Sequence, residues 1–377
     1  MDRRTLLCAI NHITPSTKET YTPLTYIECT GEQYIDLGYV VQEDDVIEMD
    51  YLSTSTASTD KMLFGSYDSN GGYIWFSLYS NTAYVRFGDT SSKSVTNARM
   101  HYKFVMKKGS CSVDGTNTIT LEFSKLSENP IYLFAYCLPN LNAYNYAYCK
   151  CFGFKITKTD GTLIMDLNPC KRDSDGAIGM LDNVSGQFFT NQGTSEDFIP
   201  GNEIKLPEGY EIIDYVTFSK NKLYDLGIIS STDKIEVMFA RNETTSTTYM
   251  YGIVTNPHTA SVSSYLSSSG AWRFGSSYRG ITITDKSIHR VEIYNGNINY
   301  DFATGTFSKS TFTTPDTAVL GGYRTASGSL SKTYQGKIYY FRIYNNGELR
   351  LDWFPCKNKE GVEGFWDCIS NKFINII

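Results

Sequence analysis

Two carboxylates lie close together on one predicted strand. Glu48 and Asp50 are separated by a single residue in an alternating segment, so both side chains would face the same side of a sheet. Paired carboxylates serve glycoside hydrolysis, in which one acts as nucleophile and the other as general acid. Position 53, where a further acidic residue would complete the run Glu-x-Asp-x-x-Glu, holds Ser53, and the similar segment at Glu236 lacks the aspartate. We therefore expect no enzymatic activity.

Other residue types that support catalysis or metal binding are spaced unfavourably. Cys149 and Cys151 alternate on a predicted strand, but no second Cys or His pair at ligand spacing completes a site. His101 and His289 each stand before a strand, where we expect hydrogen-bonded edge residues rather than general bases. Zinc-protease, nucleophile-elbow and phosphate-loop patterns are absent from the sequence. No cofactor or metal site is predicted from these residues.

Aromatic side chains are the residues that could bind a ligand. The chain has 29 Tyr, 21 Phe and 4 Trp, and sugars present apolar C–H faces that stack on Tyr and Trp. A surface rich in Tyr can equally contact another protein. The candidates are Tyr67, Tyr73, Trp75, Tyr144, Tyr146 and Tyr148, with Trp272, Tyr278 and Tyr323 as their candidate equivalents in the second half. The sequence leaves both kinds of contact open.

The segments that position these residues occur twice. Matching residues recur at an offset that shrinks from 189 to 185 residues along the chain, as small loop deletions in a shared fold would produce. The matched positions include Tyr26, Asp36, Leu37 and Gly38 with Tyr215, Asp225, Leu226 and Gly227, and Gly176, Gly179, Asp182, Ser185 and Phe188 with Gly361, Gly364, Asp367, Ser370 and Phe373. A duplication of one module therefore sets the architecture.

Alternating polarity predicts strands in both halves. Residues 46–52 and 102–106 alternate in the first copy, as do 235–239 and 337–344 in the second, and Asp-Gly and Asn-Gly pairs supply turns. No window of 12 residues shows convincing helical periodicity. Many short antiparallel strands in each copy favour a two-sheet sandwich or jelly roll. We predict an N-terminal anchoring arm over residues 1–22, jelly-roll domain 1 over 23–201 and jelly-roll domain 2 over 208–377.

Composition narrows the classes of partner. The net charge of -6 comes from 34 basic and 40 acidic residues that are interspersed, which argues against a nucleic-acid partner. No run approaches the roughly 18 apolar residues of a membrane helix, and the apolar run 6–10 is shorter than a signal peptide requires. The nine cysteines are spread unevenly and show no repeated disulfide framework, which favours assembly in a reducing cytoplasm.

Two segments resemble a known family. Residues 26–38 and 175–191 look like the opening and closing strands of the laminin-G-like, concanavalin A-like jelly rolls found in tailed phages of gut bacteria and in surface proteins of those bacteria. The resemblance implies an all-β protein with two tandem sandwiches after an extended N-terminal arm. The family has calcium-binding members, but we expect Asp36, Asp182, Asp225 and Asp367 to be turn or capping residues. Related jelly rolls also include endo-glucanases that carry the acidic run discussed above.

The resemblance implies a phage virion structural protein, such as a head fibre, capsid decoration or tail appendage. Its arm, anchored by Leu6, Leu7 and Ile10, would dock on other virion proteins of the capsid or tail, and its two lectin-like domains would serve adhesion to the host or to a host-surface glycan. We expect a homo-oligomer on the virion surface, synthesised in the host cytoplasm. The alternatives are a bacterial cell-surface glycan-binding protein, which would require export, and a polysaccharide-degrading enzyme, for which the acidic run is incomplete at Ser53.

Overall fold

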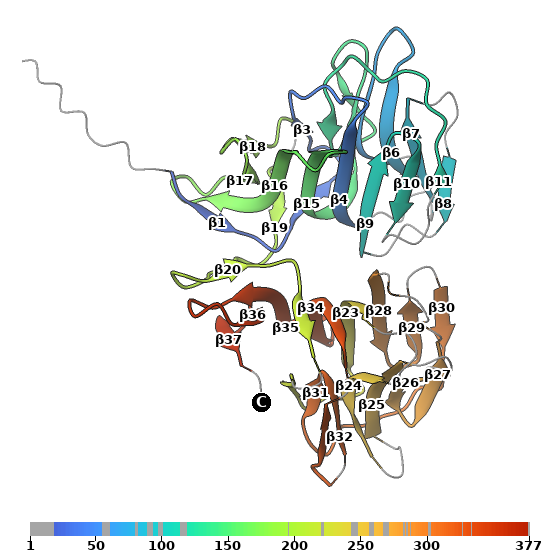
Figure 1. Cartoon of the computed structure of the whole chain (residues 1–377), viewed down its shortest axis with the longest axis vertical. Coiled ribbons are helices and arrows are strands. Elements are labelled where there is room, and N and C mark those ends of the chain that lie inside the picture. The colour runs from blue at the N-terminus through green and yellow to red at the C-terminus, as the bar shows by residue number, and fades with distance from the viewer. Residues whose placement is uncertain are drawn as a thin grey trace, which may run out of the picture.

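The computed structural model shows two β-sandwiches, one above the other in Figure 1. It describes residues 19–54, 61–79, 82–88, 93–96, 101–113, 119–194, 196–219, 222–242, 248–255, 260–266, 271–281, 283, 286, 288–300, 303–325, 327–332 and 334–375. These residues contain strands and turns and no α-helix, so the predicted all-β class is confirmed. Among them there is also no helix of the length and apolarity needed to cross a membrane.

The larger sheet of the first sandwich runs β11-β10-β9-β4-β15-β16-β17-β18. Its strands are β4 (Asp45–Ser53), β9 (His101–Lys107), β10 (Ser110–Val113), β11 (Ile119–Thr120), β15 (Tyr148–Lys158), β16 (Leu163–Arg172), β17 (Ile178–Asp182) and β18 (Phe188–Thr190). Three short strands join it: β1 (Tyr21–Pro23) pairs with β16, β2 (Ile27–Thr30) with β15, and β19 (Ile199–Pro200) with β2. Tyr21 and Thr22, which we assigned to the arm, thus lie in a strand of this sheet.

The second sheet of the first sandwich runs β14-β13-β5-β6-β7-β8. Its strands are β5 (Lys61–Tyr67), β6 (Tyr73–Tyr79), β7 (Thr82–Phe87), β8 (Lys93–Thr96), β13 (Tyr136–Cys137) and β14 (Ala143–Tyr144). β12 (Tyr132–Leu133) pairs with both β5 and β3 (Ile35–Asp36).

The second sandwich repeats this topology. Its larger sheet runs β30-β29-β28-β23-β34-β35-β36-β37, and its other sheet runs β22-β31-β24-β25-β26-β27. The strands of the larger sheet are β20 (Glu211–Ile212), β21 (Val216–Phe218), β23 (Asp233–Arg241), β28 (Ile288–Tyr294), β29 (Asn297–Tyr300), β30 (Ala303–Thr306), β34 (Gly336–Asn345), β35 (Glu348–Lys357), β36 (Glu363–Asp367) and β37 (Lys372–Ile374). The other sheet contains β22 (Tyr224–Gly227), β24 (Thr248–Val254), β25 (Ser261–Leu266), β26 (Ala271–Gly275), β27 (Ser277–Gly280), β31 (Ala318–Leu320), β32 (Gly322–Thr325) and β33 (Leu330–Lys332). Within the described part of the chain, only β19 lacks an equivalent.

Each sandwich encloses its own apolar core. On β4, Ile47, Met49 and Tyr51 point inward and are fully buried, while the residues between them face outward. The rings of Phe76 and Phe104 stack across the two sheets at 3.9 Å. Successive strand residues alternate between the two faces of a sheet. When every second residue is buried in the core, the residues between them lie on the outer face. The outward-facing side chains are therefore available to contact a ligand.

The linker between the sandwiches is fastened to both. The amide of Ile204 donates to the Pro23 carbonyl at 2.7 Å, while the Ile204 side chain packs with Cys356 and Trp366 of the second domain. The Asn202 carbonyl accepts from the Thr25 amide at 2.9 Å, and its side-chain amide donates to a carboxylate of β35. These opposed attachments restrict how the two domains can turn against each other.

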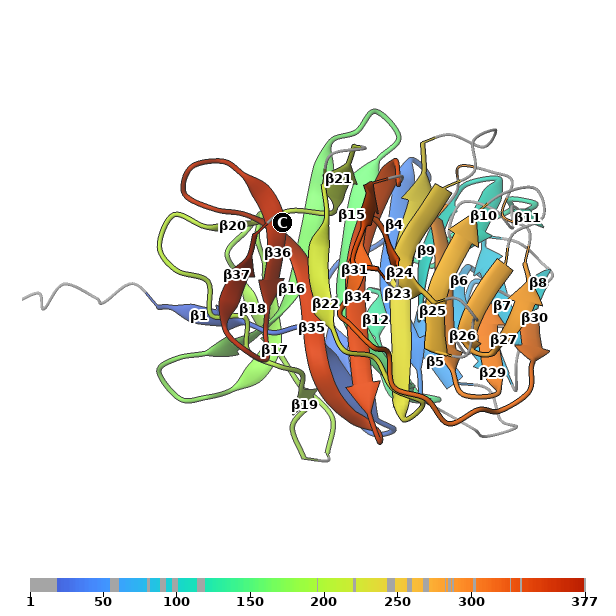
Figure 2. The same ribbon diagram turned by 90° about the horizontal axis from the view of Figure 1, so that it is seen from below.

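The domains meet through the outer faces of their larger sheets. Met238, Ala240 and Tyr340 occupy outward positions of β23 and β34, yet they are buried. An ion pair crosses the boundary between Arg290 Nη2 and Asp50 Oδ1 at 3.5 Å. Figure 2 shows the chain from below, with the second domain in front of the first. The arm residues Leu6, Leu7 and Ile10 lie outside the described residues.

Candidate functional site

The second sheet of the first domain presents an aromatic and polar outer surface. Along β6, Ile74, Phe76 and Leu78 point into the core and are buried. Alternation places the residues between them on the outside. The outward side chains of β6 and β7 are Tyr73, Trp75, Ser77, Tyr79, Thr82, Tyr84 and Arg86. None of these seven is aliphatic.

Register brings five of the outward positions together. Trp75 is the Cα partner of Gly65 on β5 and of Arg86 on β7, and Tyr67 is the partner of Tyr73. The Tyr67 and Tyr73 rings stack at 4.5 Å with an interplanar angle of 14°, and Tyr136 of β13 lies 6.4 Å from Tyr67 at 12°. The group of Tyr67, Tyr73, Trp75, Arg86 and Tyr136 is called the aromatic face below.

Arg86 lies over the Tyr73 ring and extends the stack formed by Tyr136, Tyr67 and Tyr73. Its Cζ lies 4.2 Å from the centre of the Tyr73 ring and 5.8 Å from that of Trp75. A guanidinium over the face of a ring is attracted by the ring quadrupole, which holds Arg86 against the column. The rings of Tyr67 and Tyr73 are stacked against their neighbours, so the column presents ring edges and phenol hydroxyl groups beside the indole of Trp75.

A glycine permits this close arrangement. A Cβ added to Gly65 would lie 2.6 Å from the Trp75 Cβ and 3.0 Å from Cδ2 of Tyr136. Any side chain at this position would have to displace Trp75, the backbone of Ile74 or the Tyr136 ring. Bare backbone at the centre of β5 thus lets Trp75 and Tyr136 approach each other.

Asp68 holds the turn that places Tyr67 opposite Tyr73. Its carboxylate accepts hydrogen bonds from the backbone amides of Asn70, Gly72 and Glu128 at 2.7–2.9 Å. Burial of the carboxyl opposes ionisation, but these amides outweigh it and lower the pKa of Asp68. The negative charge of Asp68 is therefore stabilised by the surrounding backbone amides.

Tyr67 and Tyr136 of the aromatic face are neutral around pH 7. A side-chain hydrogen bond with Tyr73 is the main cause that raises the pKa of Tyr67, and burial raises the pKa of Tyr136. Neutral phenols can both donate and accept hydrogen bonds. The face is thus suited to a ligand that has apolar patches and hydroxyl groups.

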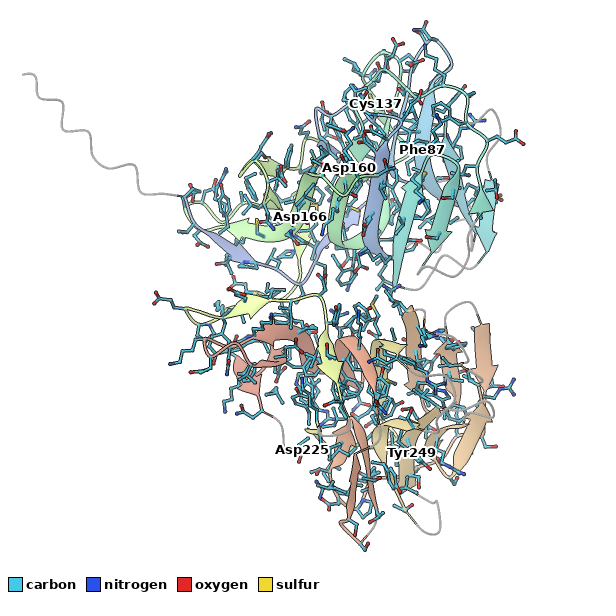
Figure 3. All side chains as sticks on the ribbon, in the orientation of Figure 1. Phe87, Cys137, Asp160, Asp166, Asp225 and Tyr249 are labelled. Carbon is cyan, nitrogen blue, oxygen red and sulfur yellow. The ribbon has the colours of Figure 1, made fainter. Side chains whose placement is uncertain are left out.

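The other candidates of the first domain are distributed over separate places. Tyr144 is 54% exposed and is the strand partner of Tyr136, so it extends the aromatic face. Tyr146 packs against Tyr34 at 6.2 Å and donates its hydroxyl to the Ala143 carbonyl. Tyr148 begins β15 in the larger sheet. Only Tyr67, Tyr73, Trp75 and Tyr144 of the predicted residues therefore belong together. Figure 3 shows the side chains of both domains.

The second domain keeps only part of this face. Gly252 pairs with Ser263, which pairs with Arg273, in the same arrangement as Gly65, Trp75 and Arg86. Ser263 therefore stands where the first domain has Trp75. By the same strand pairing, Val254 stands at the position of Tyr67, and Ser261 at that of Tyr73. Tyr323 takes the place of Tyr136. Its ring lies 4.4 Å from that of Tyr249.

Trp272 is not an exposed equivalent, and this prediction is wrong. Its ring is fully buried in the core of the second domain, 6.0 Å from Tyr251 and 6.3 Å from Phe239. Its neighbour Arg273 takes the outward position, so alternation turns Trp272 inward. The side chain of Tyr278 lies outside the described residues.

The remaining sequence candidates have structural contacts. Glu48 pairs with Lys103 at 2.7 Å, and Cys149 contacts Cys29 inside the core, Sγ to Sγ at 3.4 Å. His289 is buried with its Nδ1 3.2 Å from the Tyr300 hydroxyl, while the side chain of His101 is outside the described residues.

The four aspartates of the repeat serve turns, as expected. Asp36 and Asp225 each accept the amide two residues on, at 2.8 and 2.7 Å. Asp182 and Asp367 each accept the hydroxyl of the serine three residues on, at 2.6 Å in both domains. In the described part of the chain, no three His, Cys, Asp or Glu residues gather as a metal-binding group.

Comparison with known proteins identifies similar structures but no family. No family model matches the chain, and no curated protein matches it. Among solved structures, it is similar to domains LG4-5 of the mouse laminin alpha1 chain, with 11% identity and a TM-score of 0.29 over 88% of this chain and 93% of that one. It is also similar to the LG1-3 region of the laminin alpha2 chain, with 13% identity and a TM-score of 0.28 over 87% of this chain and 63% of that one.

Proposed function

We propose that the chain is a non-enzymatic binding protein whose first domain takes a glycan on its aromatic face. The observation that carries this proposal is the column of Tyr136, Tyr67, Tyr73 and Arg86 beside Trp75. A pyranose has one apolar C–H surface and a ring of hydroxyl groups. The indole offers the matching apolar surface, and the phenols offer the matching polar groups.

The polar groups of the face suit a glycan. Tyr, Trp and Arg are also enriched in protein interfaces, so a protein partner is the second candidate. The outward residues of β6 and β7 are aromatic, hydroxylic or cationic, which supplies hydrogen-bonding groups for the hydroxyls of a sugar. Because their rings are already stacked on one another, a ligand would cost them little conformational entropy.

Only one glycan site is expected in each chain. The second domain has Ser263 at the position of Trp75, so it lacks the indole that would carry the stacking contact. Its role in this proposal is to support and orient the first domain through the fastened linker.

We further propose that the protein is displayed on a phage particle as a head fibre, capsid decoration or tail appendage. Support for this finer proposal comes from the resemblance of residues 26–38 and 175–191 to phage jelly rolls. Leu6, Leu7 and Ile10 would dock on a capsid or tail protein, and copies of the chain would follow the symmetry of that platform. A bacterial surface protein that binds glycans is the alternative.

Deletion of residues 1–18 tests the proposed display. The deletion spares β1 (Tyr21–Pro23), so both sandwiches should fold. Truncated protein that no longer enters particles would support docking through this segment. Normal incorporation would refute it.

The glycan proposal is tested with a glycan array probed by the full chain and by Trp75→Ala. Loss of a central aromatic contact costs about 2 kcal/mol, so the variant should bind about 30-fold more weakly. Ser263→Ala, at the equivalent position of the second domain, is the matched control and should bind as the unaltered chain does. An array without hits, or full binding by Trp75→Ala, would refute the proposal.

A further inference from the structure

Two cysteines face each other across neighbouring strands in the core of the first domain. Cys29 lies on β2 and Cys149 on β15, and the two residues are direct partners in the antiparallel pairing of these strands. Both side chains point into the sandwich, where Cys29 is 1% exposed and Cys149 is fully buried. Their Sγ atoms lie 3.4 Å apart, and the Cys29 thiol also lies 3.3 Å from the carbonyl oxygen of Cys149. Both cysteines are free thiols.

This placement meets the geometric requirements of a disulfide bond. A disulfide needs Cα atoms about 4.4–6.8 Å apart, and directly opposed residues of an antiparallel pair are about 4.5–5.5 Å apart. The two Sγ atoms would have to approach each other by about 1.4 Å to reach the bonded distance of about 2.05 Å. Rotation of the two side chains about their Cα–Cβ bonds supplies a shift of this size, so the strands can stay in place.

The next cysteine on β15 is placed differently. Cys151 lies on the same face of the strand and is also fully buried, but its partner on β2 is Ile27. Directly opposed side chains of two strands lie closer to each other than diagonal ones do. The register therefore makes Cys149, rather than Cys151, the partner of Cys29.

We propose that Cys29 and Cys149 form a disulfide bond when the chain folds in contact with a small-molecule disulfide such as oxidised glutathione. One cysteine, as its thiolate, attacks a sulfur of oxidised glutathione, which gives a mixed disulfide and releases one glutathione thiolate. The second cysteine thiolate then attacks the cysteine sulfur of that mixed disulfide and releases the other glutathione. The two cysteines lose two protons and two electrons in total, and oxidised glutathione is reduced to two molecules of glutathione.

The bond would fasten the N-terminal end of the first domain to its centre. β2 has four residues and pairs with β15 on one side and with the two-residue β19 on the other. β15, in contrast, has 11 residues and pairs with β4 along most of its length. The two cysteines are 120 positions apart in the sequence. A link between them restricts the unfolded chain over a long loop, which stabilises the folded domain.

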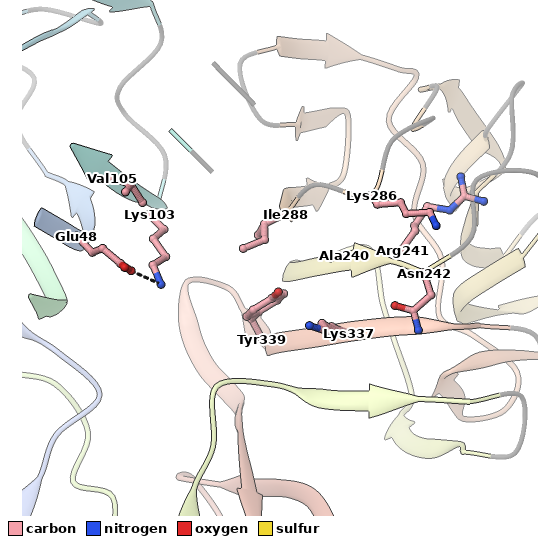
Figure 4. Close-up of a pocket in the computed structure, with 10 residues that line it drawn as sticks. All are labelled: Glu48, Lys103, Val105, Ala240, Arg241, Asn242, Lys286, Ile288, Lys337 and Tyr339. Carbon is pink, nitrogen blue, oxygen red and sulfur yellow. Dashed lines mark ion pairs between the residues drawn. The ribbon is translucent and has the colours of Figure 1, made fainter. Parts of the chain in front are cut away.

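Burial favours formation of the bond during folding rather than afterwards. Thiolates attack disulfides, and burial raises the pKa of the Cys149 thiol well above its ordinary value. The cleft between the domains in Figure 4 gives glutathione no direct path, because its first-domain side is formed by Glu48 and Lys103 on the outer face of the sheet. Cys29 and Cys149 point to the inner face. The redox state that the pair acquires during folding should therefore persist.

Peptide mapping after refolding tests the proposal. The full chain is unfolded in urea with dithiothreitol, transferred out of the reductant, and refolded with either a mixture of reduced and oxidised glutathione or reduced glutathione alone. Trypsin places Cys29 in the peptide 19–61 and Cys149 in the peptide 126–150, while Cys151 begins the next peptide. We expect mass spectrometry to find the first two peptides linked to each other in the oxidised sample only.

Three variants separate the proposed pair from other cysteines. Cys149→Ala should abolish the linked peptide. Cys151→Ala, which removes the next cysteine on the same face of β15, should retain it, and so should Cys137→Ala, which removes the other cysteine of peptide 126–150.

Calorimetry measures the effect of the bond on the fold. Oxidation of the unaltered chain should raise the midpoint of one unfolding transition by about 5 °C or more, and Cys149→Ala should show no such shift. No linked peptide after oxidative refolding, a link at Cys137 or Cys151 instead of Cys149, or equal midpoints of the oxidised and reduced chains would overturn the proposal.

Discussion

Asp182 is the last residue of β17 in the first sandwich, and its replacement by alanine should destabilise that domain strongly. The carboxylate is 2% exposed and accepts hydrogen bonds from the amides of Asp166, Val184 and Ser185 at 2.8–3.2 Å and from the Ser185 hydroxyl at 2.6 Å. In Asp182→Ala all four donors lose this acceptor. Water can replace it at the partly exposed turn, so we count two lost bonds to a charged group. The expected loss in the free energy of unfolding is about 3 kcal/mol.

The Asn variant should separate charge from shape. Asp182→Asn keeps one oxygen in place and removes the charge, so its loss should be about half as large, about 1.5 kcal/mol. Burial opposes ionisation of Asp182, but its hydrogen-bond donors outweigh that effect and lower its pKa. A lowered folded-state pKa means that the stabilisation is complete above the unfolded pKa of about 3.9 and is lost as the pH falls through the folded value. Below about pH 4, the Asn variant should therefore lose less stability than the unaltered chain.

Urea unfolding followed by tryptophan fluorescence measures these losses. Trp75 is the only tryptophan of the first domain, whereas the second domain has three. Asp367→Ala is the matched control, because Asp367 accepts the equivalent hydrogen bonds in the second domain. It should shift the second-domain signal instead. A free energy of unfolding for Asp182→Ala within about 0.5 kcal/mol of that of the unaltered chain, or equal losses in the Asn and Ala variants, would contradict this prediction.

Two further predictions concern the cores. Burial raises the pKa of Cys111 and of Cys356 to about 12. Iodoacetamide at pH 8 should therefore modify neither thiol in the folded protein but both thiols in urea, as measured by mass spectrometry. Rapid labelling without urea would contradict this prediction. Trp272→Ala should lower the free energy of unfolding by about 3–5 kcal/mol, because it empties a fully buried site. Trp75→Ala should cost less than about 1 kcal/mol in the same denaturation assay, and similar losses in both variants would contradict the assigned positions.

Local signals in the sequence were sufficient to predict the fold. The repeated Asp-x-x-Ser turns, which begin at Asp182 and Asp367, and the alternating strands of both halves identified a duplicated all-β module. The structure confirms it through two sheets of the same strand order in each half. These features depend on neighbours in the chain, and pattern reasoning detects such neighbours directly.

The complete aromatic face could not be predicted, because it depends on strand register. Tyr67, Tyr73 and Trp75 were found from a single loop. Arg86 and Tyr136 come from other strands, and only the pairing of β5, β6, β7 and β13 places them beside those three. A shift of one residue in that pairing would turn each of them to the opposite face.

Trp272 shows how residue type alone can mislead. It was named from the sequence as a candidate equivalent of the aromatics in the first half. The match of Arg273 to Arg86 already aligns Trp272 with Val85, a core position. Alternation then predicts an inward side chain, as the structure has it. Aligning Trp272 with its equivalent position in the first copy would therefore have predicted that its side chain is buried.

The most direct test of the glycan site is fluorine NMR of the full chain labelled with 5-fluorotryptophan. Its four tryptophans should give four resonances, and the Trp75→Ala variant assigns one of them. When a saccharide found on the array is added, the account predicts that the Trp75 resonance shifts while those of the buried Trp272, Trp353 and Trp366 stay in place. A saccharide that binds and leaves the Trp75 resonance unchanged would contradict the account.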